Sequence, residues 1–180
     1  MSILKVARMG HPVLRNKTRP MSQSDIVSAA VQQLIDDMID TLLEYNGAGL
    51  AAPQVHEGVR VFVAHVPPEG DESADRRDDV LAVINPEIVP FGRHVEEDWE
   101  GCLSIPDLRG QVPRFRDIRV TGFDRRGERI DIEATGFSAR VMQHEADHLD
   151  GVLFLDRMKT FQSLSFLDEY ARYHAKRDDE

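Results

Sequence analysis

The stretch His144-Glu145-Ala146-Asp147-His148 lies within residues 138–150, a segment whose pattern predicts a helix that Gly151 would end. On a helix, residues four positions apart lie one turn above each other, so both imidazoles can reach one cation. Glu145 would then lie beside the ion, where an activated water needs a general base. One stripe of this helix is expected to face inward, formed by Phe137, Val141, His144 and His148.

The pattern has simpler interpretations that stay open at this point. Both histidines could be core residues with ordinary hydrogen-bond partners, and Glu145 could face solvent. Because a five-residue pattern also arises by chance, the metal interpretation needs support from elsewhere in the chain.

A catalytic ion usually takes three protein ligands and leaves the fourth position for water. His174 and Glu169 lie near the end of the chain and are poor candidates for the third ligand. Cys102, the only cysteine, is the alternative, since Gly101 allows close backbone approach and Pro106 fixes the exit. A lone cysteine can also be a small buried hydrophobe. One thiolate with two imidazoles suits iron, zinc, cobalt or nickel better than magnesium or calcium.

The composition indicates one globular domain. A chain of 180 residues with 41% hydrophobic residues can bury a core, and its apolar runs are too short to span a bilayer. The net charge of −10 argues against broad contact with nucleic acid, although not against a local basic patch. A single cysteine excludes an intramolecular disulfide and suits a reducing compartment.

Local patterns predict the remaining elements. Ser24 is the expected N-cap of the first helix, and residues 67–79 between the first two strands are expected to be a mobile surface loop. The end of the chain, from residue 170 to 180, is expected to fray. The predicted elements are a helix at 24–45, strands at 59–66 and 80–85, a hairpin of 117–123 with 129–134, and a helix at 160–175.

Three segments, taken in order, resemble the peptide deformylase family. The opening of the chain, Gly10-His11-Pro12-Val13-Leu14-Arg15, also resembles the usual start of that family, and the likeness runs from about residue 3 to about residue 157. The three segments are Gly47-Ala48-Gly49-Leu50-Ala51-Ala52-Pro53-Gln54, Glu100-Gly101-Cys102-Leu103-Ser104 and His144-Glu145-Ala146-Asp147-His148.

The resemblance implies an α+β fold in which antiparallel β-sheets pack around a central helix that carries the His-Glu-x-x-His metal motif. It implies one catalytic domain over residues 1–180. The implied activity is a metal-dependent hydrolysis that removes the N-formyl group from the N-terminal formyl-methionine of newly synthesised proteins and releases formate. The implied metal ligands are Cys102, His144 and His148, with Fe²⁺ as the expected ion and Zn²⁺, Ni²⁺ or Co²⁺ as other ions that these donors accept.

The resemblance also implies how the reaction proceeds. A metal-bound water attacks the formyl carbonyl, and Glu145 acts as general base and then general acid. Gln54 and the backbone N–H of Leu103 bind the developing oxyanion. Without the resemblance, Gln54 would be interpreted as a surface residue after a Gly-rich turn.

Five residues are expected to contact the substrate. Gly49 and Gly101 would offer backbone groups to an extended peptide. Arg109 would meet the peptide backbone near the entrance, unless it is only a solvated charge. Phe137 and Val141 fit an apolar wall for the methionine side chain.

Two positions depart from the family pattern. Arg140 stands where many bacterial members carry an aliphatic residue, and Ala48 is smaller than the residue often found there. We predict that the preference for methionine survives, with a wider pocket and an arginine lid.

The expected partner is a formyl-methionyl peptide or nascent chain. Contact with the ribosome is left open, because the charges of the C-terminal tail are mixed in sign. No membrane or specific nucleic-acid partner is expected. The expected location is a bacterial-type cytoplasm, with an organelle as the alternative if a presequence has been removed.

Two other functions compete with this one. A zinc endopeptidase also uses a His-Glu-x-x-His motif, and it would have no need of Cys102. A metal-stabilised binding module would have a closed site of four protein ligands and no catalytic water.

Overall fold

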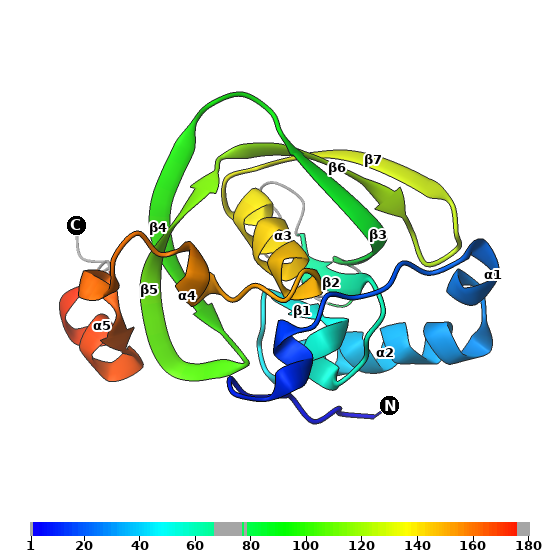
Figure 1. Cartoon of the computed structure of the whole chain (residues 1–180), viewed down its shortest axis with the longest axis horizontal. Helices are drawn as coiled ribbons and strands as arrows, with labels where there is room; N and C mark the ends of the chain where they lie inside the picture. Colours follow the sequence, from blue (N-terminus) through cyan, green and yellow to red (C-terminus); the bar gives the residue numbers. More distant parts are fainter. Residues whose placement is uncertain (1, 67–76, 78, 176–180) are drawn as a thin grey trace.

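The computed structural model of the chain describes residues 2–66, 77 and 79–175 (Figure 1). Its described strands form two antiparallel sheets, one of order β1-β2-β3-β6-β7 and one of order β4-β5-β8. The strands are β1 (Gly49–Ala51), β2 (Val61–His65), β3 (Val80–Pro90), β4 (Val95–Cys102), β5 (Ile105–Phe115), β6 (Asp117–Phe123), β7 (Arg129–Thr135) and β8 (Ser165–Phe166).

Helices and short 3₁₀ turns complete the described part of the chain. The α+β class expected from the sequence is confirmed by this combination of antiparallel sheets and helices. The helices are α1 (Gln23–Ile26), α2 (Ala29–Glu44), α3 (Gly136–Leu149), α4 (Phe154–Arg157) and α5 (Leu167–Tyr173), and the 3₁₀ turns are η1 (Pro12–Arg15), η2 (Ala52–Val55) and η3 (Phe161–Ser163).

The five-stranded sheet has a helix on each face. Side chains alternate along its strands, so apolar residues point to both faces and each face can bury the apolar side of a helix. On β2, Val61 and Val63 pack in the cluster that contains the buried side of α2, including Ile35 and Leu42. Phe62, between them, packs in the cluster that contains the buried side of α3. In Figure 1, α2 and α3 accordingly lie on different sides of β1 and β2.

Helix α3 confirms the helix predicted at residues 138–150, with bounds shifted by one or two positions. It packs against β1, β2, β5 and β7, and therefore touches strands of both sheets. Gly151 follows the helix with a φ of 74°, a conformation that glycine adopts readily. A Cβ atom at this position would also lie 2.6 Å from the carbonyl oxygen of Arg15, so the chain has no room for a side chain there.

The helix predicted at residues 24–45 is confirmed over Ala29–Glu44, but its single continuous span is wrong, because the chain forms two helices there. Ser22, and not Ser24, caps α1 through a capping box with Asp25. Ser28 then caps α2, with its hydroxyl accepting from the N–H of Val31 and donating to the carbonyl of Asp25. Serine and aspartate side chains compete with the helical backbone hydrogen bonds, which is why the break falls among them.

The single helix predicted at residues 160–175 is also wrong. This segment forms η3, β8 and α5, because β8 pairs with the edge of β5 and so overrides the helical pattern. The side chain of Ser163 accepts from the N–H of Gln111 on β5 and holds the segment against that strand. The end of the chain is expected from its sequence to fray from residue 170. In the structure α5 continues to Tyr173, and the ring of Tyr170 packs on Trp99.

The predicted hairpin is confirmed, with β6 and β7 joined through a turn in which Gly127 has a φ of 79°. The predicted strands at residues 59–66 and 80–85 are present as β2, which is shorter, and β3, which continues to Pro90. The loop expected at residues 67–79 falls, apart from residues 77 and 79, outside the described residues, and so does the charged tail at residues 176–180. None of the described helices combines the length and the apolar character needed to cross a membrane.

Candidate metal centre and active site

Three side chains from two elements meet in the interior of the molecule. Their candidate ligand atoms, from Cys102, His144 and His148, all lie within 4.8 Å of one another. Cys102 ends β4 at a register irregularity in the pairing with β5, whereas the two histidines lie one turn apart on α3. Sγ of Cys102 is 3.2 Å from Nε2 of His148, and the imidazole centroids are 4.9 Å apart.

This donor set fits a transition metal. One sulfur and two imidazole nitrogens are the ligands that zinc, iron, cobalt and nickel accept. In the described part of the chain, no other group of His, Cys, Asp or Glu is placed to hold an ion in this way. The three residues that the sequence suggested as ligands are therefore the ones that the fold brings together.

The sulfur of Cys102 is surrounded by hydrogen-bond donors. Nε2 of Gln54 lies 3.5 Å from it, and the N–H of Ser104 lies 3.4 Å from it. Burial alone would raise the pKa of this thiol, but the charge of His148 and hydrogen bonds from both histidines hold the pKa well below its ordinary value. The site therefore favours the thiolate, which is the form that binds metals.

Glu145 lies next to the three candidate ligands and is only 4% exposed. Burial raises the pKa of its carboxyl group to about 7. Oε2 is buried and has no hydrogen-bond partner among the described residues. A carboxyl group whose pKa is close to neutral can take up and release a proton at physiological pH, as a general base and acid must.

Gln54 is not the surface residue that its sequence context alone would indicate, since it is 1% exposed. Its Oε1 accepts from the N–H of Ala51 at 2.8 Å, which turns Nε2 toward the metal centre. Nε2 then lies 3.2 Å from the hydroxyl of Ser104 as well as close to Cys102. The amide is therefore fixed with its donor end at the site.

A buried carboxylate orients His144. Oε2 of Glu100 lies 2.9 Å from Nδ1 of His144, which leaves Nε2 for the metal centre. Arg114 donates to both oxygens of Glu100, at 2.9 and 3.0 Å, and Arg140 donates to Oε1 at 2.8 Å. Burial would raise the pKa of Glu100, but hydrogen bonds from His144 and Arg114 lower it to about 2. A partner of this kind fixes the ring of a metal-binding histidine.

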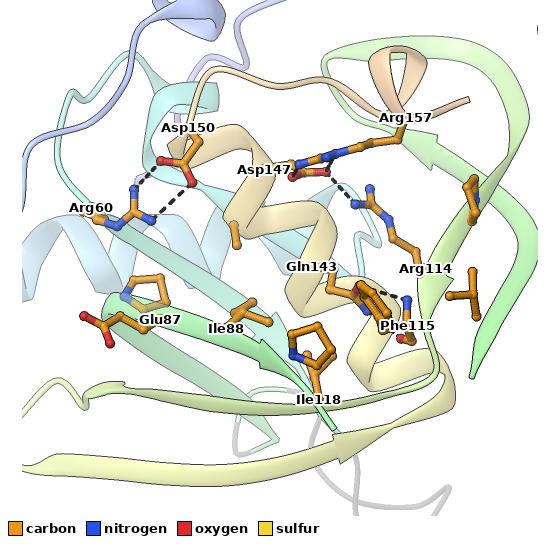
Figure 2. A pocket seen from close by; sticks show the side chains of 15 residues that line it. Arg60, Glu87, Ile88, Arg114, Phe115, Ile118, Gln143, Asp147, Asp150 and Arg157 are labelled. Atoms are coloured by element: carbon orange, nitrogen blue, oxygen red, sulfur yellow. Dashed lines mark hydrogen bonds and ion pairs between the residues drawn. The ribbon is translucent and has the colours of Figure 1, made fainter. Parts of the chain in front are cut away.

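The same network returns to α3 through Asp147. Arg114 bridges Glu100 and Asp147, so β5 ties β4 to the helix. Arg157 of α4 also pairs with Asp147 and contacts both of its carboxylate oxygens (Figure 2). The side chains between α3 and these strands thus form one connected set of ion pairs, running from Arg157 to His144.

Arg140 is not the lid that the sequence predicted. It is 7% exposed, and its guanidinium also donates to the carbonyls of Val112 and Glu96. Sequence reasoning missed the roles of Glu100, Arg114 and Asp147, although two of these residues lie inside the quoted motifs. The register of β4 and β5 places Arg114 opposite Glu96 and Glu100 opposite Gly110, so no local pattern in the sequence identifies the Arg114–Glu100 pair.

An open cavity of about 820 Å³ leads to the metal centre. Val141 lies on its wall and is buried, whereas Phe137 lies on the same wall and is 67% exposed, so the inward stripe predicted for α3 is wrong at Phe137. The other residues expected at the active site also line it: Ala48, Gly49, Gln54, Gly101, Leu103, Arg109 and Glu145.

Two of the glycines at this cavity, Gly49 and Gly101, lie where a side chain would collide with a neighbouring polar group. A Cβ on Gly101 would lie 2.1 Å from Nη1 of Arg109, so the guanidinium lies directly over the glycine backbone. A Cβ on Gly49 would collide with Glu145 in the same way. Each glycine therefore makes room for a polar side chain at the cavity, in addition to any backbone contact with a substrate.

Another face of α3 borders a second cavity of about 520 Å³ (Figure 2). Its walls carry the Asp150–Arg60 pair and the Asp147–Arg114 pair. Four of the charged groups there form these two pairs, and neither Glu145 nor Cys102 lines this space. The chemistry of the metal centre therefore belongs to the larger cavity.

Comparison with known families agrees with this geometry. A model of the polypeptide deformylase family matches residues 3–163. The chain belongs to this family. Membership confirms that the chain is a deformylase, a metal-dependent hydrolase of protein biosynthesis, as the three sequence segments predicted.

The sequences and structures of individual peptide deformylases align with most of the chain. Peptide deformylase 2 of Nostoc sp. is 41% identical over 168 residues, 93% of this chain and 93% of that protein. Peptide deformylase 1A of Arabidopsis thaliana, described as chloroplastic/mitochondrial, is 37% identical over 175 residues, 91% of this chain and 65% of that protein. The Met-Ala-Ser-bound crystal structure of the class I type b peptide deformylase from Acinetobacter baumannii has a TM-score of 0.79 and 39% identity, covering 88% of this chain and 100% of that chain.

Proposed function

We propose that the chain hydrolyses the N-formyl group of formyl-methionyl peptides, with a divalent ion held by Cys102, His144 and His148. The observation that carries this proposal is the position of Glu145, a buried carboxyl group with a pKa of about 7 beside that donor set and open to the substrate cavity. The His-Glu-x-x-His pattern on α3 then acts as the catalytic motif, and residues 1–180 act as one catalytic domain.

Fe²⁺ is the proposed ion, and the same three donors also suit Zn²⁺, Ni²⁺ and Co²⁺. When bound, the ion would lower the pKa of a water toward ~7 and polarise the formyl carbonyl. Glu100 supports this role, because its hydrogen bond to Nδ1 keeps His144 in one orientation.

Glu145 moves the protons of the reaction. Its carboxylate takes a proton from the attacking water and passes one to the amine that leaves. A pKa of about 7 suits both steps, since the group is then neither a very weak base nor a very weak acid at neutral pH. Gly49 leaves the space that this carboxyl group occupies.

Gln54 and the N–H of Leu103 stabilise the oxyanion that forms at the formyl carbon. The fixed amide of Gln54 supports this role, because a donor that is already oriented needs no rearrangement during the reaction. Leu103 follows Cys102 directly and lines the same cavity.

The substrate lies in the cavity as an extended peptide. Phe137 and Val141 form the apolar wall for the methionine side chain, while Gly49, Gly101 and Arg109 contact the peptide backbone. The peptide Met-Ala-Ser bound in the A. baumannii structure supports a substrate of this chemical class. We place the reaction in a bacterial-type cytoplasm, with an organelle as the alternative because of the Arabidopsis relative.

An anaerobic assay of formate release from formyl-Met-Ala-Ser, with iron-loaded and zinc-loaded protein, tests the proposal. We expect deformylation by the wild type and a loss of about 10²–10⁴-fold in Glu145→Gln at unchanged metal content. Glu97→Gln, an exposed carboxylate that pairs with Lys159, is the matched control and should remain active. An inactive wild type, or an active Glu145→Gln variant, contradicts the proposed function.

Cys102→Ala separates the proposal from a zinc endopeptidase. Because Sγ lies within ligand distance of the histidine pair, we expect this variant to lose stoichiometric metal. A variant that keeps its metal and cleaves unformylated peptides internally would support the protease.

A further inference from the structure

The last helix of the chain contributes to the wall of the substrate cavity. Leu167, the first residue of α5, lines the cavity and is 38% exposed. The match to the deformylase family model ends at residue 163, before β8 and α5 begin. In Figure 1, α5 lies against the outer side of β4 and β5. This wall is therefore an addition to the part of the chain that the family model covers.

Two sets of contacts hold Leu167 at that position. Across the β5–β8 pairing, Ser165 lies opposite Arg109, which itself lines the cavity. One turn further along, the Trp99 ring packs on Tyr170 and on His174, with centroid distances of 4.8 and 4.9 Å. The segment is thus fixed to β5 at its start and, through Trp99, to β4 at its end, and β4 carries Cys102.

Leu167 is one of the apolar side chains at the cavity. Trp99, which holds α5 through Tyr170, also lines the cavity, so α5 and β4 each contribute an apolar side chain to its surface. The neighbouring Phe166 is 65% exposed and does not line the cavity, so the contact is specific to one position of the segment. The cavity volume of about 820 Å³ is typical of sites that enclose a whole small ligand. The cavity therefore has room for more of the peptide than the formylated methionine.

We propose that Leu167, held at the cavity by β8 and α5, selects peptides with an apolar side chain after the formyl-methionine. This inference rests on the proposed function of the same cavity. Contact with Leu167 removes apolar surface of the substrate from water and so strengthens the binding of such peptides. A peptide with a serine at that position, or one that ends before it, gains no binding free energy from contact with Leu167.

Steady-state kinetics of the metal-loaded protein with formyl-Met-Ala, formyl-Met-Ala-Ser, formyl-Met-Leu-Ser and formyl-Met-Ala-Leu tests this. We expect Leu167→Ala to lower kcat/KM for at least one leucine-containing peptide about three- to tenfold more than for formyl-Met-Ala-Ser, mainly through KM. Leu167→Met should restore the preference, because it returns an apolar side chain of similar size. Phe166→Ala is the matched control, and its substrate ranking should be that of the wild type.

Two results overturn the assignment. One is an unchanged ranking of the four substrates in Leu167→Ala, and the other is an equal change in Leu167→Ala and Phe166→Ala, which would mean that α5 acts only through stability. In both cases the wild type still releases formate, so the proposed function stands. An inactive wild type overturns both.

Discussion

The carboxyl group of Glu145 lies so close to the backbone of Gly49 that a Cβ on Gly49 would be 2.4 Å from Oε1. β1 and α3, which carry these residues, are far apart in the sequence and pack together in the fold. The glycine therefore sets where the carboxyl group can lie relative to the metal centre.

Replacing Gly49 with alanine should displace this carboxyl group and leave the fold in place. We expect a loss of about 10²-fold in kcat/KM, because a catalytic group moved by about 1 Å loses activity on that scale. Deformylation kinetics with metal content measured in parallel checks this. Gly58→Ala is the control, since a Cβ there meets nothing within 4 Å. Full activity in Gly49→Ala would show that the carboxyl group tolerates displacement.

Glu100→Gln should weaken metal binding, because Glu100 orients the candidate ligand His144. The variant removes a buried charge that Arg114, Arg140 and His144 share. We expect metal affinity to fall about 10–100-fold and the free energy of unfolding to fall by about 3–5 kcal/mol. Metal titration and denaturant unfolding measure the two effects. Glu97→Gln on the same strand lies in an exposed pair and should change stability by less than about 1 kcal/mol.

Gln54→Ala should lower kcat and stability together. Loss of the Nε2 donor is expected to reduce kcat about 10²–10³-fold. Loss of Oε1 leaves the N–H of Ala51 without its partner, which costs about 1–3 kcal/mol in the free energy of unfolding. Ser104→Ala removes a neighbour of Nε2 but keeps both Gln54 atoms, so it is the control, and its kcat should fall far less. An unchanged kcat in Gln54→Ala would remove this residue from the reaction.

The ion pair of Asp156 with Arg15 should make stability depend on pH in the acid range. Burial would raise the pKa of Asp156, but hydrogen bonds from Arg15 and from the N–H of Leu153 hold it below 3.8. A lowered pKa stabilises the fold above the ordinary pKa, and this stabilisation is lost as the pH falls through the folded value. Asp156→Asn should therefore lower the free energy of unfolding by about 0.5–1 kcal/mol at neutral pH.

The difference between wild type and Asp156→Asn should shrink as the pH falls below 3.8. Denaturant unfolding of the metal-free wild type and variant, at neutral pH and below pH 3.8, checks this, because loss of bound metal then cannot contribute to the difference. A double-mutant cycle with Arg15→Gln isolates the pair. A difference that grows on acidification would contradict the assignment.

The sequence was sufficient for the features that depend on local spacing. Two histidines four residues apart must share one face of a helix, and Glu145 between them must lie near that face. The turn at Gly127 and the helix end at Gly151 follow from glycine at positive φ. These results need no knowledge of distant parts of the chain.

The errors arose where distant contacts compete with local propensity. The helix expected at residues 160–175 gives way to β8, because the edge of β5 offers backbone hydrogen bonds that the local pattern does not contain. The stripe expected to bury Phe137 fails because the cavity opens at that end of α3.

The sequence by itself indicated the three candidate metal donors and determined the helix that carries two of them, since that helix follows from residue identity and spacing. Only the tertiary structure decided that Glu100 orients His144, that Arg140 is buried beside it, and that Leu167 borders the cavity. The physical reason is that a buried charge is stable only beside partners, and those partners are set by strand register and helix packing.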